Sequence, residues 1–202
     1  MRIFSWKNGV AAMAAASEKA LLSRSRTRGA GAQGNFSVAF LQKSVYNIVM
    51  LKLRVVAVGD IKERFYREAI AEYVKRLGRW AKTEIIEVSE SSHLTDAEKK
   101  RAEEGEAILG RIKGKMILTD LKGQKVKSEE IASLLKDSAL AGESELTFVI
   151  GGSNGVSPAV KARSDRIISF GDITLPHQLF RVVLLEQLYR AETILNGTSY
   201  HK

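Results

Sequence analysis

The feature that most constrains the fold is a regular alternation, from residue 51 onward, of short β-branched runs with longer amphipathic segments. Expected strands cover residues 51–59, 83–89, 115–121, 145–150 and 166–171, and expected helices cover residues 62–78, 96–113, 128–140, 157–164 and 176–196. Strands that alternate with helices build parallel β-α-β units. Since no linker or internal repeat interrupts them, the pattern predicts one α/β domain, with helices on both faces of a mainly parallel sheet.

Local signals support these segments. Ser128 and Ser157 are expected N-caps, and Pro158 suits the first position of a short helix. The run "ELTFVI" has no charge after Glu145, which is typical of a central parallel strand. The first expected helix carries an apolar stripe that we assign to the core. Its members are Phe65, Tyr66, Ala69, Ile70, Tyr73, Val74 and Leu77.

Composition excludes several function classes. The chain has no cysteine, which rules out disulfides, thiolate catalysis and thiolate metal sites. Its three histidines are scattered, so no metal is expected. Since no apolar run approaches the roughly 18 residues of a membrane helix, no membrane span is expected either.

The net charge of +9 is unevenly distributed. Residues 1–47 contain seven basic side chains and one acid, so only +3 remains for the rest of the chain. This leader is rich in Ala, Ser, Gly and Arg, and its segment "SRSRTRGAGAQG" has no apolar periodicity. That composition is typical of an organellar transit peptide; the alternative is a basic arm that contacts RNA. We therefore expect residues 1–49 to be a disordered leader for a plastid or a mitochondrion, and residues 50–202 to form the domain.

Three loops follow the carboxyl ends of expected strands, where parallel sheets bind ligands: "TDLKGQ", "GGSNG" and "FGDITLPH". The glycines of the second leave bare backbone at its surface. It does not match the Walker pattern, because Val156 follows Gly155, and its glycine spacing fails the dinucleotide fingerprint. The loop is either a tight turn or a backbone site for adenine, ribose or a zwitterionic amino acid.

Further candidate site residues lie at the two ends of the last expected helix. Pro176 suits a helix start, and His177 and Arg181 lie one turn apart, so they should share a face and form a small basic edge beside the loops. Tyr200 and His201 follow the capped end of that helix, where fraying is the ordinary expectation.

Three blocks in this order resemble the RlmH family of SPOUT-type RNA methyltransferases, which methylate a pseudouridine of large-subunit ribosomal RNA. They are "VVAVGDIKERFYREAIAEYVKRLG", "FVIGGSNGVSPAV" and "FGDITLPHQLFRVVLLEQLYRA", with "YHK" at the end of the chain. The resemblance runs from about Lys52 to Lys202. It implies a C-terminal trefoil knot, S-adenosyl-L-methionine as methyl donor, and a homodimer with a shared active site that acts on ribosomal RNA or an assembled ribosome.

The resemblance also implies site residues. The donor would be held largely by the backbone of Thr119, Gly151, Gly152, Phe170, Gly171, Asp172, Ile173, Thr174 and Leu175. The acceptor would be ring nitrogen 3 of a pseudouridine. The candidates to accept its proton or stabilise its developing negative charge are His177, Arg181, Tyr200 and His201. The sequence does not select the base among them.

Two other function classes are alternatives to a methyltransferase. A non-catalytic RNA- or nucleotide-binding module could keep this fold and lack the chemistry. A nicotinamide-dependent oxidoreductase would need the glycine fingerprint and the acid that follows it, and the chain has neither.

Overall fold

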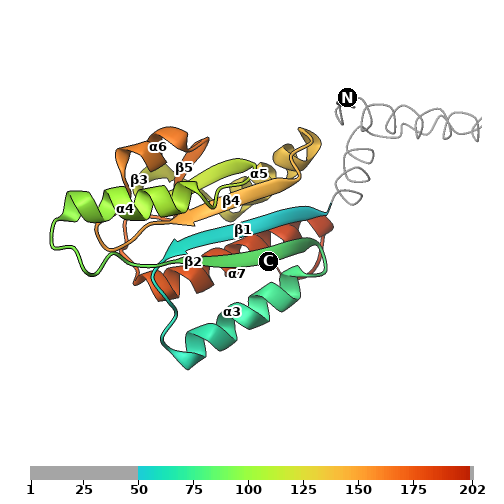
Figure 1. The fold of residues 1–202 in the computed structure, drawn as a ribbon. Helices are drawn as coiled ribbons and strands as arrows, with labels where there is room; N and C mark the ends of the chain where they lie inside the picture. Colours follow the sequence, from blue (N-terminus) through green and yellow to red (C-terminus); the bar gives the residue numbers. More distant parts are fainter. Residues whose placement is uncertain (1–49, 201–202) are drawn as a thin grey trace, which may run out of the picture.

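The structure is a computed structural model, and it describes residues 50–200 (Figure 1). Ten helices and strands alternate strictly in this part of the chain. They are β1 (Leu51–Val58), α3 (Arg64–Leu77), β2 (Ala81–Val88), α4 (Ala97–Leu109), β3 (Lys115–Lys125), α5 (Ser128–Leu140), β4 (Glu145–Ile150), α6 (Pro158–Arg163), β5 (Arg166–Ser169) and α7 (His177–Asn196).

The five strands form one sheet in the order β2-β1-β4-β3-β5, and every pair of neighbours is parallel. The order places β4, β3 and β5 next to one another. The carboxyl ends of parallel strands meet at one edge of a sheet. The loops after β3, β4 and β5 therefore lie side by side, although they are up to about 50 residues apart in the chain.

The direction of each crossover decides which face its helix covers. The β1–β2 and β3–β4 connections step toward one edge of the sheet, and β2–β3 and β4–β5 step toward the other. Since such crossovers are right-handed, the two sets of helices must lie on opposite faces. Figure 1 shows α3 and α7 on one side of the sheet and α4 and α6 on the other.

Alternate residues of β1 enter two separate cores. Leu53 and Val55 are fully buried among side chains of α3, α5 and α7, whereas Val56 and Val58 pack with Ile108 of α4 and other residues of the second face. Both faces of a central strand are therefore apolar, as expected for a doubly covered parallel sheet.

The predicted fold class and the order of elements are confirmed, and several local assignments differ. Phe65 is 58% exposed, so the assignment of the whole α3 stripe to the core is wrong at that residue. Ser128 is the first residue of α5 and not its N-cap; its hydroxyl bonds Gln187 of α7 instead (Oγ–Oε1 2.7 Å). β3 runs on to Lys125, because its last residues pair with β5 beyond an irregularity between Thr119 and Gln124.

Two further predictions concern the chain as a whole. The trefoil knot stays a prediction, and the leader lies outside the described residues. Within residues 50–200, no helix has the length and apolar character needed to cross a membrane.

Candidate active site

A cavity of about 470 Å³ opens at the carboxyl edge of the sheet. Its wall comes from residues 119–122 of β3, from the ends of β4 and β5 and the loops that follow these two strands, and from the first turns of α7. The volume lies within the range of small-molecule sites, and the location is the one that parallel sheets use for ligands.

Eight of the nine residues expected to hold a methyl donor line this cavity. They are Thr119, Gly151, Gly152, Phe170, Gly171, Ile173, Thr174 and Leu175. Asp172 does not line it: its carboxylate is largely exposed and pairs with Lys125 (Oδ2–Nζ 2.5 Å). Asp172 therefore joins the β5–α7 loop to the end of β3.

The glycines of the "GGSNG" loop are required for two different reasons. A β-carbon on Gly151 would lie 2.6 Å from Val156 Cγ1, and one on Gly152 would lie 2.7 Å from Glu104 Oε2. Gly155 has φ +79° with open space around it, and its N–H bonds the Gly152 carbonyl (2.9 Å). The bare backbone at the cavity is thus imposed by close packing behind the loop and by a tight turn at its tip.

Apolar side chains supply most of the remaining wall. The rings of Phe170 and Phe180 lie 5.3 Å apart, tilted at 51°, and both line the cavity. At the rim, Leu121 is 51% and Ile173 is 78% exposed. The cavity can therefore take a flat, largely apolar group against its aromatic side.

Asp120 places a carboxylate on the cavity wall. It accepts the Lys122 N–H (Oδ1, 2.9 Å) and pairs with Lys161 of α6 (Oδ2–Nζ 2.9 Å). Burial by itself would raise the pKa of Asp120, but these partners outweigh it and hold the pKa below its usual range. Asp120 is therefore ionised at neutral pH, with the Lys161 ammonium as its counter-charge.

His177 is the first residue of α7 and lines the cavity, as the sequence predicts for a residue beside these loops. Pro176 precedes it as the helix cap. The "LPH" turn thus brings the imidazole to the ligand side of the sheet.

Arg181 does not join His177 at an exposed basic edge, so that expectation is wrong. The side chain is 1% exposed; it pairs with Glu87 of β2 (Nη1–Oε1 2.8 Å) and donates to the carbonyls of Val58 (2.7 Å) and Gly59. Burial lowers the pKa of Arg181, and Glu87 opposes that shift. One turn along a helix separates the two residues, but the sheet packed below α7 puts Arg181 in the interior.

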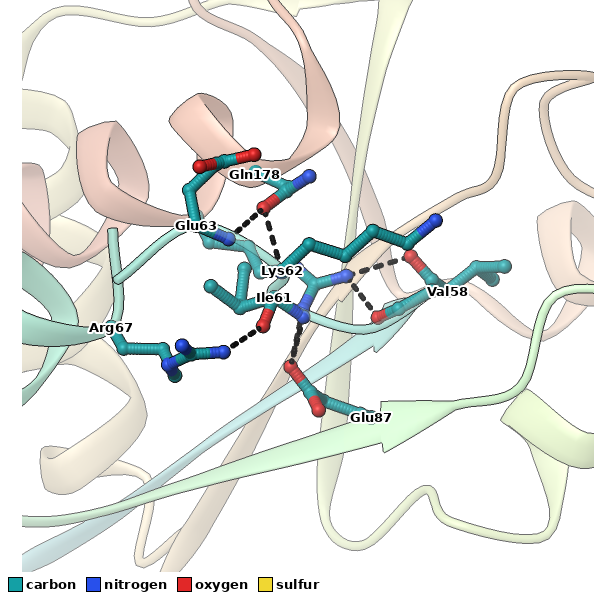
Figure 2. A network of polar contacts seen from close by, with 9 residues as sticks. Val58, Ile61, Lys62, Glu63, Arg67, Glu87 and Gln178 are labelled. Carbon is teal, nitrogen blue, oxygen red and sulfur yellow. Dashed lines mark hydrogen bonds and ion pairs between the residues drawn. The ribbon is translucent and has the colours of Figure 1, made fainter. Parts of the chain in front are cut away.

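Arg181, which bonds Val58 and Glu87, belongs to a network that joins α7 to the β1–α3 loop. Figure 2 labels Val58, Glu87, Gln178 and residues of that loop. The Gln178 side-chain oxygen accepts the N–H groups of Lys62 (3.0 Å) and Glu63 (3.5 Å), and Glu87 also accepts the Ile61 N–H (3.1 Å). The start of the helix that carries His177 is therefore held against the end of β1.

Tyr200 lies away from the cavity of its own chain. Its hydroxyl donates to Glu186 (Oε1, 3.1 Å), and its ring contacts Tyr189 with centroids 4.8 Å apart. Burial, together with hydrogen bonding to Tyr73 and Glu186, raises the pKa of Tyr200 to about 12, which disfavours a role as a base at neutral pH. Glu186 is nine residues beyond His177, or about 13 Å along the helix axis. His201 lies outside the described residues.

Sequence reasoning missed part of the wall. Five wall residues lie in two of the predicted ligand-side loops but were not singled out: Asp120, Leu121, Lys122, Ser153 and Gly155. The residues missed altogether are Ile150, Val156, Ile168, Ser169, Phe180 and Val183. A signal for Asp120 was available, since it directly follows the apolar part of the third strand. Phe180 was harder to identify, because an aromatic residue on a long apolar helix is ordinarily core.

A family sequence model described as "Predicted SPOUT methyltransferase" matches residues 51–201. The chain belongs to the SPOUT methyltransferase family.

Curated relatives agree with this membership. A protein of Limosilactobacillus reuteri named "Ribosomal RNA large subunit methyltransferase H" is 48% identical over 159 residues, which are 75% of this chain and all of the relative. A protein of the same name from Carboxydothermus hydrogenoformans is 47% identical over the same shares.

Solved structures give more distant matches. A probable methylase family protein of Haemophilus influenzae has a TM-score of 0.42 at 14% identity, over 74% of this chain and 70% of that one. The TrmH/SpoU tRNA modifying enzyme of A. aeolicus has a TM-score of 0.36 at 13% identity, over 80% and 87%.

Proposed function

We propose that this SPOUT-family protein is an S-adenosyl-L-methionine-dependent methyltransferase that methylates ring nitrogen 3 of a pseudouridine in large-subunit ribosomal RNA. The observation that carries the proposal is the convergence on one cavity of eight residues expected to hold the donor. The name of the two relatives, ribosomal RNA large subunit methyltransferase H, supports a ribosomal substrate, since this chain matches their entire length.

The residues of the cavity fit such a donor. The Phe170–Phe180 side can take an adenine ring, and the glycine backbone at Gly151 and Gly152 leaves room for a ligand to lie against the chain. The anionic Asp120 suits a ligand with a positive sulfonium and an ammonium group.

The donor supplies an electrophilic methyl group bound to a positive sulfur. In the transfer, the nitrogen–methyl bond forms as the sulfur–methyl bond breaks, and the sulfur keeps the bonding electron pair as a neutral thioether. The acceptor nitrogen also loses its imide proton, which needs an acceptor within reach. His177 is the candidate to take that proton, since it lines the cavity.

Tyr200 and the tail would act from a second copy of the chain. Within one chain Tyr200 is held at Glu186, away from the cavity. A homodimer that brings the tail of one copy to the cavity of the other would complete the acceptor side. Tyr200 would then act as a hydrogen-bond donor, consistent with its raised pKa.

We also propose that the protein acts inside a plastid or mitochondrion, and that its substrate there is ribosomal RNA or an assembled ribosome. The support is the basic, acid-poor composition of residues 1–49, which lie outside the family match. The net charge of only +3 after the leader predicts weak binding to naked RNA, because affinity for RNA comes largely from phosphate neutralisation.

Two measurements test the proposal. Calorimetry should show binding of S-adenosyl-L-methionine to the purified protein, and large ribosomal subunits that lack the modification should gain one methyl group on a pseudouridine, located by mass mapping. Donor binding without transfer to any ribosomal substrate would favour the binding module. Mass mapping of organellar ribosomal RNA with and without the protein tests the location.

A further inference from the structure

Glu104 is a carboxylate buried behind the cavity wall. It lies on α4 and is 3% exposed. Its Oε1 accepts the Ser91 N–H at 3.1 Å, but its Oε2 is buried and has no hydrogen-bond partner among the described residues. Since buried polar atoms nearly always have a partner, the free oxygen indicates an interaction that forms in another state.

The free oxygen faces the donor loop. A β-carbon on Gly152 would lie 2.7 Å from Glu104 Oε2, so this oxygen sits directly behind the Gly152 backbone. Gly152 itself lines the cavity. One layer of backbone therefore separates the carboxylate from the ligand space.

The neighbouring residue fixes α4 in this place. A β-carbon on Gly105 would collide with Ser157 Oγ, so only glycine lets α4 lie this close to the start of α6. Ser157 caps α6 by accepting the Val160 N–H at 3.3 Å. The Glu104–Gly105 pair thus holds α4 against both ends of the "GGSNG" loop.

We propose that Glu104 is a positioning residue for the donor loop: Oε2 accepts an N–H from the Gly151–Gly155 segment when the donor fills the cavity. The inference rests on the proposed function, because it assigns the loop to the methyl donor. It links donor binding to α4 and to Ser91, neither of which lines the cavity.

The test compares two isosteric variants by calorimetry and thermal melting. Glu104→Gln keeps the volume and one acceptor but replaces the other oxygen by an NH₂ group, which cannot accept an N–H. We expect its affinity for S-adenosyl-L-methionine to fall on the order of tenfold. Glu103→Gln is the control. The Glu103 carboxylate is half exposed and, among the described residues, bonds the side chains of Ser91 and His93. The donor affinity of this variant should stay unchanged.

A double-mutant cycle tests the packing separately. Gly152→Ala should weaken donor binding in the wild-type background, because its new methyl group meets Glu104. In a Glu104→Ala background the same change should cost much less, since only the milder contact with Val58 (3.2 Å) remains.

The outcomes separate the inference from the proposed function. Wild-type protein that binds no S-adenosyl-L-methionine contradicts the proposed function. If wild type and Glu104→Gln bind S-adenosyl-L-methionine with the same affinity, the inference about Glu104 is wrong and the proposed function stands. Additive effects in the double-mutant cycle lead to the same conclusion. A fall in melting temperature for Glu104→Gln at unchanged donor affinity marks a merely structural carboxylate and also overturns it.

Discussion

At the scale of single residues, the structure assigns different roles to side chains that the sequence grouped together. His177 reaches the cavity, Arg181 is buried one turn later, and Tyr200 is held at Glu186. Burial and hydrogen bonding decide these roles, and neither can be read from residue type. Of the three, only His177 combines a titratable group with direct access to the ligand space of its own chain.

Replacing His177 by alanine should therefore lower kcat about 100-fold or more, the usual contribution of a general base, while donor affinity stays nearly unchanged. Single-turnover methylation and calorimetry measure the two effects. His93→Ala is the matched control, because that imidazole is 65% exposed, pairs with Glu103 and lies outside the cavity. Equal rates for both variants would remove His177 from the proton-transfer step.

The contribution of Tyr200 to the free energy of unfolding should change with pH only at high pH. Its pKa is raised from 10.0 to about 12 in the folded protein. The tyrosine therefore stabilises the fold fully below pH 10, and this contribution is lost as the pH rises toward 12. Urea unfolding should show a steeper loss of stability from pH 10 to pH 12 for wild type than for Tyr200→Phe. Parallel curves for the two proteins would show that the tyrosine is not in this environment.

At the scale of elements, the contacts of α7 connect the site to the rest of the sheet. Arg181 and Gln178 hold its first turns to the end of β1, and Ser128 of α5 bonds Gln187 further along. The helix that carries His177 is thus fixed on two sides. Its placement depends on buried polar contacts as well as on the apolar residues Leu184, Leu185 and Leu188.

Arg181→Met should lower the free energy of unfolding by about 2–4 kcal/mol, because it leaves the carbonyls of Val58 and Gly59 without their donor and Glu87 without its cationic partner. Urea denaturation at fixed protein concentration measures this loss. Arg64→Met, which breaks an exposed pair with Glu68, should change stability little. A comparable loss in both variants would contradict the structural role of the buried network.

At the scale of the whole molecule, two of our proposals reach beyond the described residues: a leader in residues 1–49 and a second copy of the chain that completes the site. The family match begins at residue 51, next to the start of β1. The cavity of one chain lies apart from Tyr200 of the same chain. The first observation concerns the proposed import into an organelle, and the second concerns the proposed homodimer.

A protein that begins at Met50 should melt at the same temperature as the full chain and bind S-adenosyl-L-methionine equally well. The reason is that residues 1–49 have no apolar periodicity and lie outside the family match. Differential scanning calorimetry and titration calorimetry compare the two proteins. A clear drop in melting temperature on truncation would show that the leader packs on the domain.

A mixed dimer tests whether the site is shared. One subunit carries Gly151→Val, which collides with Val156 behind the donor loop, and the other lacks Tyr200, His201 and Lys202. If sites are shared, one pocket joins an intact loop to an intact tail, and the mixed dimer regains up to half the wild-type rate. A fully inactive mixed dimer would contradict the shared site, provided that each parent variant is folded and dimeric.

The sequence by itself determined the fold class, the order of elements and the loops that supply part of the cavity wall. Apolar periodicity marks strands and helices locally, and the bounds of α5 and β4 match their predicted ranges. The glycine loop and the "LPH" turn were identifiable because glycine and proline restrict the backbone within a few residues of their own positions.

Only the tertiary structure decided which of these residues meet. The strand order placed three distant loops at one edge, and the pairing of β3 with β5 extended β3 beyond its apolar run. The packing of α7 on the sheet buried Arg181, and the close approach of α4 put Glu104 behind Gly152. These outcomes depend on contacts between residues tens of positions apart, whereas propensity and periodicity describe only near neighbours in the chain.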